Sequence, residues 1–350
     1  MNKSAKRRVL FISSNDGSDM RINKELKTLS QQYEVTFIGV GLSNKESYAR
    51  NYCKYFYLIS GKRNRPLTIL KQLWLVTKLA FKGYDSIHVI NEQLMIFFYP
   101  FMFGKHVVLD IFDSIFLMKN KSRNKWLLIK KIIYAPVDVI LVTDNNRKTL
   151  MPDFTQDKIR VLENFPYHYT GPIRVNSASS SLTLLYNGWL GKNRGTDLVN
   201  QLLAVDNNVK IIMAGWFADE QSRELIKHPQ VDYRGIMTQE QALSIAATEA
   251  DYILCVYASN NENNINASPN KIYDAIQTHT PVIANAEIKI STFVKENKIG
   301  VVIDNYNTFN PIELLAELSA KKNTFSFSPD LIETYTWEKI EDILITAHAK

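Results

Sequence analysis

The chain has 350 residues, of which 45% are hydrophobic, and a formal net charge of +7. This length exceeds that of a usual single domain and can bury a sizeable core, so we expect two domains. Only two cysteines occur, Cys53 and Cys255, and their positions far apart in apolar stretches exclude a disulfide framework and favour a reduced, cytoplasmic protein.

The first half of the chain alternates short apolar runs with segments of helical periodicity. Residues 1–8 are basic, but the apolar run after them is too short for the core of an export signal. The strongest apolar run, Leu94–Phe103, is interrupted by Pro100 and is about half as long as a bilayer-spanning helix requires. We therefore expect no export signal and no transmembrane helix. The expected elements are a helix at Asn23–Gln32 and strands at Val9–Ser13, Val35–Val40, Ser86–Ile90, His106–Asp110 and Val139–Val142.

Positive charge is concentrated in this first half. Residues 1–170 hold 27 Lys and Arg against 14 Asp and Glu, whereas the remainder holds 15 against 21. Such an excess suits nucleic acid, an anionic membrane surface or an anionic substrate. Two segments, Pro66–Lys82 and Lys119–Tyr134, place basic residues beside tryptophan and aliphatic side chains, as helices at an acidic membrane interface do. The alternative is a helix that packs on the sheet of its own domain. We favour this alternative for residues 66–82, and both interpretations stay open for residues 119–134.

A linker and a second βα series follow. Residues 164–181 carry Pro166, Gly171 and Pro172 before a run of serine and alanine, which is typical of an interdomain connection. The two successive series predict two doubly wound parallel sheets that bind ligands beyond the carboxyl ends of their strands. The final segment, Pro329–Lys350, is helical in pattern and is expected to cross back to the first domain. The second series contains helices at Thr196–Ala204, Gln239–Ala247 and Pro269–Gln277, and strands at Leu182–Tyr186, Val209–Ala214, Val231–Tyr233, Tyr252–Val256, Pro281–Ala284 and Gly300–Ile303.

The most informative segment runs from residue 268 to residue 284. Ser268 is a good N-cap, Pro269 suits the first helical position, and Lys271 and Asp274 lie in the first turns. The free N–H groups at such a helix start, the helix dipole and Lys271 would bind a diphosphate, and Asp274 would accept hydrogen bonds from ribose hydroxyls. An ordinary capped helix of a βα unit explains the same residues equally well.

This segment resembles the donor-binding motif of retaining glycosyltransferases of the two-domain GT-B fold, particularly glycosyltransferase family 4. The resemblance is carried by Ser268–Ile276 and Thr280–Ile283, and it extends over nearly the whole chain because further segments follow in the family's order. They are Ser18–Glu25, Tyr33–Ile38, Leu109–Asp113, Val161–Asn164, Leu185–Leu190 with Arg194 and Gly195, Ile212–Gly215, Tyr233–Gly235 and Tyr335–Glu338.

The resemblance implies an α/β fold of two doubly wound Rossmann-like domains facing across a cleft. Residues 1–166 would form the acceptor-side domain, 167–181 the linker, 182–333 the donor domain, and 334–350 a C-terminal helix. It also implies a metal-independent site for a nucleotide-diphosphate sugar, without a cofactor. Arg194 and Lys271 would carry the charge of the leaving diphosphate and, with Asp113, form the catalytic set. The donor-binding residues would be Gly188, Arg194, Gly215, Gly235, Ile236, Asn266, Ser268, Pro269, Asn270, Lys271 and Asp274.

Five positions depart from the family pattern. The family commonly has two acidic residues eight positions apart, where this chain has Asn266 and Asp274. Trp189 replaces an arginine that follows the loop glycine, and Phe112 replaces a histidine near the acceptor-side strand. His279 stands where a helix-ending glycine is usual.

Other polar residues are candidates for the acceptor side because they follow expected strands. They are Asp16, Gly17, Asp19 and Glu92, which join Asp113, and an ordinary polar loop is the alternative for each. The six histidines lack metal-ligand spacing, so no metal site is expected, and His88 is interpreted as a core or cleft-edge histidine rather than a ligand.

The resemblance therefore implies a cytoplasmic glycosyltransferase, peripheral at the inner face of the cytoplasmic membrane. It would transfer a sugar, with retention, to a glycan or lipid-linked glycan in cell-surface polysaccharide synthesis, and its basic first domain would approach the anionic membrane. The alternatives are a GT-B nucleotide-sugar epimerase and a non-catalytic protein that binds nucleotide sugars or glycans. Nucleic-acid binding is not expected, because the sequence has no recognition module.

Overall fold

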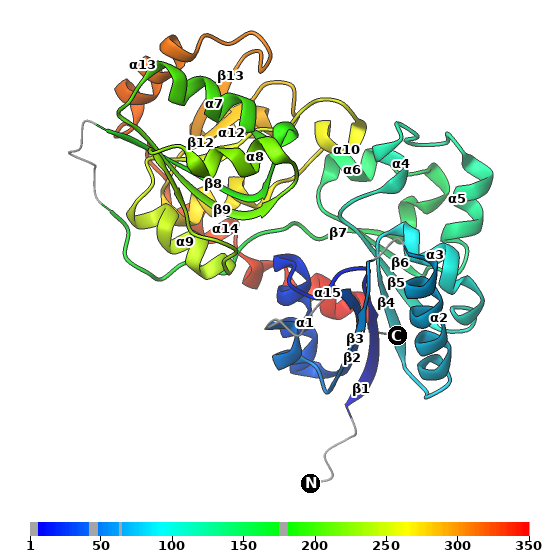
Figure 1. The fold of residues 1–350 in the computed structure, drawn as a ribbon. Helices are drawn as coiled ribbons and strands as arrows, with labels where there is room; N and C mark the ends of the chain where they lie inside the picture. Colours follow the sequence, from blue (N-terminus) through cyan, green and yellow to red (C-terminus); the bar gives the residue numbers. More distant parts are fainter. Residues whose placement is uncertain (1–5, 42–47, 63–64, 175–180, 350) are drawn as a thin grey trace. The chain divides into compact units, whose positions relative to one another are not determined.

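The computed structural model describes residues 6–41, 48–62, 65–174 and 181–349 and divides the chain into two compact units (Figure 1). The first unit comprises Met1–Glu163 and Ile340–Lys350, and the second comprises Asn164–Lys339. Of the linker predicted at 167–181, residues 175–180 lie outside the described residues. Residues 164–174 belong to the second unit, where Arg174 pairs with Asp251 at 2.6 Å.

The first unit is built on a seven-stranded parallel sheet in the order β3-β2-β1-β4-β5-β6-β7. The central strand β1 pairs with β2 on one side and β4 on the other, with Val9 opposite both Val35 and Ser86. Because the inner strands are covered on both faces, they read as continuous apolar runs. The strands are β1 (Arg7–Ile12), β2 (Tyr33–Gly41), β3 (Tyr55–Ser60), β4 (Ser86–Ile90), β5 (His106–Ile111), β6 (Val139–Val142) and β7 (Ile159–Val161).

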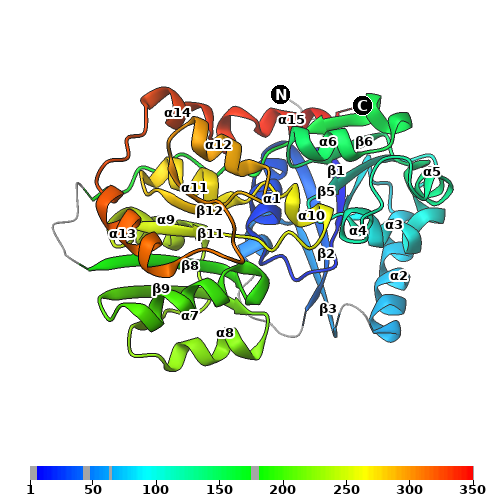
Figure 2. The ribbon, with the colours of Figure 1, turned by 90° about the horizontal axis from the view of Figure 1, so that it is seen from above.

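Helices cover both faces of this sheet. The connection from β1 to β2 runs toward the β3 edge of the sheet, whereas the later connections, from β4 to β5 and from β5 to β6, run toward the β7 edge. Because each connection is right-handed, the helix after β1 lies on one face of the sheet and the helices of the later connections lie on the other. One face carries α1 (Met20–Gln32) and α15 (Glu341–Ala347), which contact each other. The other carries α2 (Pro66–Ala80), α3 (Glu92–Phe98) and α5 (Leu127–Tyr134), which lie side by side in Figures 1 and 2. The remaining helical segments are η1 (Tyr48–Tyr52), η2 (Tyr99–Phe101), α4 (Ile115–Met118), α6 (Asn145–Leu150) and η3 (Asp153–Lys158).

The two basic segments singled out in the sequence both lie on the α2–α3–α5 side. Residues 66–80 form one helix whose Val76 and Leu79 are buried in the core, as the packed-helix interpretation requires. A single helix over 119–134 is wrong, because α5 begins only at Leu127. Three residues before it, Asn120, Arg123 and Trp126, have φ between 50° and 58°, a left-handed conformation that a continuing α-helix excludes.

The second unit repeats the architecture with a six-stranded parallel sheet in the order β10-β9-β8-β11-β12-β13. Strand β8 is central and extends to Leu190, four residues beyond its predicted end at Tyr186. The strands are β8 (Leu182–Leu190), β9 (Val209–Phe217), β10 (Val231–Tyr233), β11 (Tyr252–Cys255), β12 (Val282–Asn285) and β13 (Gly300–Ile303). The helices are η4 (Lys192–Arg194), α7 (Thr196–Val205), α8 (Glu220–Glu224), η5 (Leu225–Lys227), α9 (Gln239–Thr248), α10 (Glu262–Ile265), α11 (Asn270–Thr278), α12 (Ile290–Glu296), α13 (Pro311–Lys321), α14 (Pro329–Thr334) and η6 (Trp337–Lys339).

The final segment of the chain is divided between the units. An aromatic cluster in the second unit holds Tyr335, whose ring stacks on Tyr273 at 5.8 Å and meets the edge of Phe165 at 5.3 Å. From residue 340 onward the chain belongs to the first unit, where His348 bonds Ser86 at 2.8 Å and His88 at 3.0 Å. Residues 164–339 therefore form one continuous unit, and the other unit is assembled from two segments.

The predicted fold class, two doubly wound parallel sheets, is confirmed. Most predicted elements occur within a few residues of their expected positions, and the edge strands β3 and β7 were missed. Among the described residues, none of the helices combines the length and the apolar character that crossing a bilayer demands.

Candidate functional site

The second sheet has a topological switch point between β8 and β11, two neighbouring strands that are not consecutive in the chain. The loop after β8 turns toward β9, whereas the loop after β11 turns toward β12. In open α/β sheets the loops diverge at this point and leave room for a ligand beyond the strand ends. Arg194, Tyr257 and Lys271 all come from the segments that follow these two strands.

The loop after β8 is rigidly held. Tyr186 accepts a hydrogen bond from the Gly191 backbone N–H at 2.7 Å, and its hydroxyl lies 3.0 Å from that of Thr196. Gly195 has φ of 115°, and a Cβ there would lie 2.7 Å from Leu254, so only glycine fits. These contacts position Arg194, whose guanidinium carbon stacks on the Tyr257 ring, 3.7 Å from its centroid. The Nη1 of Arg194 is buried and lacks a hydrogen-bond partner among the described residues.

Lys271 lies in the first turn of α11, and its Nζ donates a hydrogen bond to the carbonyl of Leu254 at 2.9 Å. Burial lowers the pKa of Lys271 to about 8, and the charge of Arg194 acts in the same direction. Within the described part of the chain, no carboxylate forms an ion pair with Arg194 or Lys271. Two neighbouring cations without a paired carboxylate, at the N-terminal end of a helix, form a site for a multiply charged anion.

The start of α11 differs slightly from the prediction. The helix begins at Asn270 with Pro269 as its N-cap residue, so Ser268 does not cap it. The Ser268 hydroxyl instead lies 3.1 Å from that of Tyr273. The N–H groups of Asn270 and Lys271 belong to the first turn, where an α-helix leaves its donors unpaired. The candidate anion site therefore lies at a helix N-terminus, as predicted, but Ser268 does not cap that helix.

Three predicted glycines are brought together at the ends of β8, β9 and β10. Gly188 is paired in register with Gly215, where a Cβ would lie 1.8 Å from the Gly188 carbonyl oxygen. Gly215 in turn donates its N–H to the carbonyl of Gly235 at 2.9 Å. A Cβ at Gly188 or Gly235 would meet no described atom within 4 Å, so both leave open space beside the backbone. Ile236, which follows Gly235, is 59% exposed.

Asp274 lies one turn along α11 from Lys271, and only 6% of its surface is exposed. Its Oδ1 accepts a hydrogen bond from Gln239 Nε2 at 2.9 Å, which ties α11 to the first residue of α9. Sequence reasoning missed Gln239, although its place just after the Gly235 turn was a usable signal. Asn187 was missed as well; its side-chain oxygen, beside Gly188, is buried and has no hydrogen-bond partner in the described part of the chain.

Three of the residues that depart from the family pattern, Asn266, Trp189 and His279, lie in well-defined surroundings. Asn266 is buried, and its Nδ2 donates to the carbonyl of Glu262 at 2.8 Å, so its amide closes the short helix α10. Trp189 is exposed near the end of β8. His279 ends α11 in the left-handed conformation, with φ of 55°, and stacks on Phe327 at 5.6 Å. A non-glycine residue in that conformation costs about 1 kcal/mol.

The acceptor-side candidates lie in the first unit. Asp16, Gly17 and Asp19 follow β1, and Asp19 caps α1 by accepting from the Arg21 N–H at 2.9 Å. Burial raises the pKa of Asp19. Asp113 is half-buried after β5, and its N–H donates to Asn91 Oδ1 at 3.0 Å. Contact between these residues and an acceptor stays a prediction.

Glu92 is fully buried, unlike a residue on an open loop. Its carboxylate accepts from the Ser114 hydroxyl at 2.7 Å, the Ile115 N–H at 3.1 Å and the Tyr134 hydroxyl at 3.2 Å. Burial raises the pKa of Glu92, while these donors act against the shift. Glu92 therefore holds the segment that follows Asp113, and direct contact with an acceptor remains a prediction.

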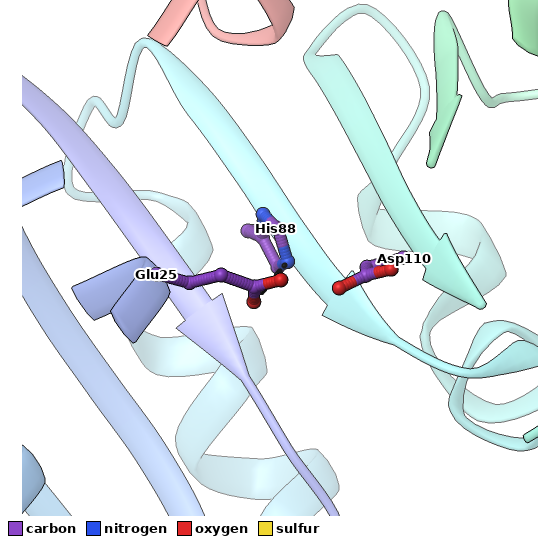
Figure 3. Close-up of side chains that lie close together, drawn as sticks. All are labelled: Glu25, His88 and Asp110. Carbon is purple, nitrogen blue, oxygen red and sulfur yellow. Dashed lines mark ion pairs between the residues drawn. The ribbon is translucent and has the colours of Figure 1, made fainter. Parts of the chain in front are cut away.

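A buried cluster in the first unit brings Glu25, His88 and Asp110 together (Figure 3). Their potential ligand atoms lie within 4.8 Å of one another, a spacing that would suit a metal ion. Arg21 already supplies the positive charge: its Nε lies 2.8 Å from Asp110 Oδ2 and 2.9 Å from Glu25 Oε1. Burial lowers the pKa of His88 and raises that of Glu25, to which the charge of Asp110 also contributes. The cluster thus has the character of a structural ion pair, in agreement with the core interpretation of His88.

The low pKa of Lys271 predicts a pH dependence of anion binding. The protonated amine binds the anion, so the dissociation constant for a nucleoside diphosphate should be nearly constant around pH 7 and about twice as large at pH 8. Above pH 8, where Lys271 loses its proton, the dissociation constant should rise about tenfold per pH unit. Titration calorimetry between pH 7 and 9.5 measures this. Lys271→Arg should give a flat profile, because a guanidinium stays charged throughout; an unchanged inflection in that variant would contradict the assignment.

No protein-family model matches the chain, and no curated protein matches it. Solved structures do match over almost its full length. HepE of Anabaena, determined in complex with UDP and glucose, has a TM-score of 0.71 at 13% identity, with 97% of this chain and 98% of that chain covered. Sucrose-phosphate synthase from Thermosynechococcus elongatus has a TM-score of 0.68 at 14% identity, with the same shares covered. The lipopolysaccharide outer core galactosyltransferase WaaB in its apo form has a TM-score of 0.61 at 14% identity, with 97% and 99% covered. Taken with the two doubly wound parallel sheets, this likeness shows that the chain has the GT-B fold.

Proposed function

We propose that the chain is a glycosyltransferase that moves a sugar from a nucleotide-diphosphate sugar to a glycan or lipid-linked glycan acceptor. The observation that carries the proposal is the pair of cations at the switch point of the second sheet, Arg194 and Lys271, which form no ion pair with a carboxylate of the described residues. The solved complexes of HepE with UDP and with UDP-glucose support it, because that protein has the same fold.

The chemistry follows from what these residues can stabilise. When the bond between the sugar C1 and the diphosphate oxygen breaks, negative charge develops on the diphosphate. Arg194, Lys271 and the first N–H groups of α11 would stabilise that charge at fixed positions. Because two side-chain cations balance the diphosphate, the proposed reaction needs no metal. The leaving diphosphate oxygen would accept the proton of the acceptor hydroxyl, and attack from the same face retains the anomeric configuration.

The nucleoside would lie toward the glycine cluster. Gly188 and Gly235 leave open space for close backbone approach, and exposed Ile236 offers an apolar contact for a base. Asp274, oriented by Gln239, would accept hydrogen bonds from the ribose hydroxyls. This arrangement assigns separate residues to the ribose and to the diphosphate, so the two contributions are separable by mutation.

The acceptor would bind to the first unit, and the protein would act at a membrane surface. We assign Asp16, Gly17, Asp19, Glu92 and Asp113 of the first unit to the acceptor side, with Asp113 in the catalytic set. A lipid-linked acceptor in cell-surface polysaccharide synthesis would bring the protein to the inner face of the cytoplasmic membrane. Reduced Cys53 and Cys255 suit that compartment.

A thermal-shift screen of uridine, guanosine and adenosine diphosphates, followed by turnover assays with the matching sugars, tests the proposal. At a concentration of 100 times the dissociation constant, a ligand adds about 2.7 kcal/mol of stability, which gives a clear rise in Tm. Turnover should persist in EDTA, and the product anomer should match the donor. Asp274→Ala should weaken nucleoside diphosphate binding and leave inorganic diphosphate binding unchanged.

The outcomes separate the candidate functions. A Tm that none of the nucleotides raises would contradict the proposal. Product formed without an acceptor would identify an epimerase, and a Tm shift without turnover would identify a non-catalytic binding protein. A non-catalytic binding protein has a specific structural basis. Asn266 has an amide where the family commonly has a carboxylate, and the Nδ2 of that amide donates to the Glu262 carbonyl.

A further inference from the structure

The outer surface of the α2–α3–α5 side is unusual for a water-exposed surface. These helices bury one side against the first sheet, through Val76 and Leu79 of α2, Met95 of α3 and Ile133 of α5. The opposite sides face away from the sheet and should be polar in a helix that meets only water. They carry large apolar side chains instead.

The clearest case is α2. Leu67, Leu70 and Trp74 are 65%, 59% and 64% exposed, and their spacing of three and four residues puts them on one side of the helix. Phe81, at the end of the same stripe, is 80% exposed. The sequence-based preference for an ordinary packed helix accounts for the buried side of α2 only.

The neighbouring elements continue this surface. In α5, Leu128 and Ile132 are one turn apart and are 74% and 52% exposed. Ile96 and Phe97 of α3, which contacts both α2 and α5, are exposed as well. We call the exposed side chains of residues 65–82, 93–105 and 116–137 the outer face; Figures 1 and 2 show its helices side by side. An exposed apolar surface spread over three helices marks an interaction site.

The charge of the outer face is of one sign. Its three segments contain eleven Lys and Arg and no Asp or Glu, and of the eleven only Lys130 is buried. Lys78 Nζ lies 5.1 Å from the centroid of the Trp74 ring, and Lys119 and Lys121 Nζ each lie 5.6 Å from that of Trp126. Lysine beside tryptophan, with leucine and isoleucine between, is the composition that enters the headgroup region of an anionic bilayer.

We infer that the outer face docks on an anionic lipid bilayer, with the apolar side chains inserted at the headgroup level and the lysines against the lipid phosphates. A second copy of this chain fits less well, because a two-fold contact would set ten positive charges against ten. Nucleic acid fits less well also, because exposed leucine and isoleucine gain nothing from a phosphate backbone. The inference deepens the proposed function by giving its membrane association a surface, and it does not depend on sugar transfer.

Co-sedimentation with vesicles tests the inference. The intact protein is mixed with vesicles of phosphatidylcholine alone or with 30% phosphatidylserine, at low and at high salt. We expect binding to the phosphatidylserine vesicles that falls at least tenfold at high salt. The triple variant Leu70→Glu, Trp74→Glu, Leu128→Glu should lose that binding, because it adds three negative charges and removes three apolar contacts. These side chains are at least 59% exposed, so the fold should persist.

Ile312→Glu is the matched control, because Ile312 is 65% exposed on α13 of the second unit. That variant should bind vesicles as the unchanged protein does. Nucleoside diphosphate binding should be equal in all three proteins, so failure of membrane docking is distinguishable from failure of the donor site. The inference is overturned if the unchanged protein does not bind anionic vesicles or if the triple variant still binds them. It is also overturned if sedimentation velocity shows that the unchanged protein is a dimer and the triple variant a monomer.

Discussion

Replacing Lys271 with methionine is expected to lower the affinity for nucleoside diphosphates about 100-fold or more, and at pH 7 to make the protein more stable. The loss of affinity follows because one of the two cations proposed to face the diphosphate is removed from a partly buried position. The gain in stability follows because burial lowers the pKa of Lys271 from 10.5 to about 8. Each pKa unit corresponds to about 1.4 kcal/mol, so the charged amine is a net cost to the unliganded fold.

The sign of that stability effect is fixed by linkage. Between pH 8 and pH 10.5 the unfolded chain keeps the proton that the folded protein has released, so the free energy of unfolding of the unchanged protein should rise with pH across this window. Methionine has a similar length and no charge. After loss of the hydrogen bond to the Leu254 carbonyl, the variant should be about 1–2 kcal/mol more stable at pH 7.

Urea unfolding at pH 7 and pH 10, together with calorimetric titration of a nucleoside diphosphate, measures both effects. Lys210→Met is the matched control, because Lys210 is an exposed lysine on β9 of the same unit. It should change neither affinity nor stability by more than about 0.5 kcal/mol. If Lys271→Met binds the nucleotide normally, or loses stability at pH 7, the anion site is wrongly assigned.

Replacing Arg21 with methionine is expected to destabilise the first unit by about 3–5 kcal/mol. Arg21 is 1% exposed and makes two hydrogen bonds to the Asp110 carboxylate, at 2.8 and 2.9 Å, and one to the Leu162 carbonyl at 2.9 Å. Removal of Arg21 would leave the Asp110 carboxylate buried next to Glu25, without the cation that balances its charge. The burial of two carboxyl groups with no cation is the source of the expected loss.

A double-mutant cycle distinguishes the buried charge from simple loss of packing. Arg21→Met with Asp110→Asn should recover part of the lost stability, because the uncompensated charge is gone. Arg234→Met is the control: Arg234 pairs with Glu249 at 2.7 Å on the surface of the second unit, where such pairs contribute about 1 kcal/mol or less. Chemical unfolding followed by circular dichroism measures each variant. A loss below about 1 kcal/mol for Arg21→Met would contradict the proposed role.

Much of the fold could be predicted because the inner strands are covered on both faces. Ser86–Ile90 and Val139–Val142 were predicted to the residue, since buried parallel strands are short apolar runs with clear ends. The edge strands β3 and β7 gave weak signals: β3 is mostly half-exposed, and β7 has three residues. The end of β8 was missed because Asn187 and Gly188 break the apolar pattern while the strand continues.

The candidate site was predictable where the residues are close in sequence and unpredictable where the fold assembles them. Lys271 and Asp274 share one helix, so their spacing alone indicated a common role. Tyr257 meets Arg194 only because the loops after β8 and β11 come together at the switch point, and Gln239 meets Asp274 only because α9 packs on α11. The burial of Glu92 could not be foreseen either, because it depends on donors more than twenty residues away.

The division of the chain into units has a consequence for biosynthesis. Residues 340–349 complete the first unit, where Tyr33 donates to the Ile345 carbonyl and His348 bonds Ser86 and His88. These residues leave the ribosome only after the entire second unit. The second unit, a single uninterrupted segment, needs no residue made after Lys339, whereas the first unit is complete only when the last-made segment has joined it.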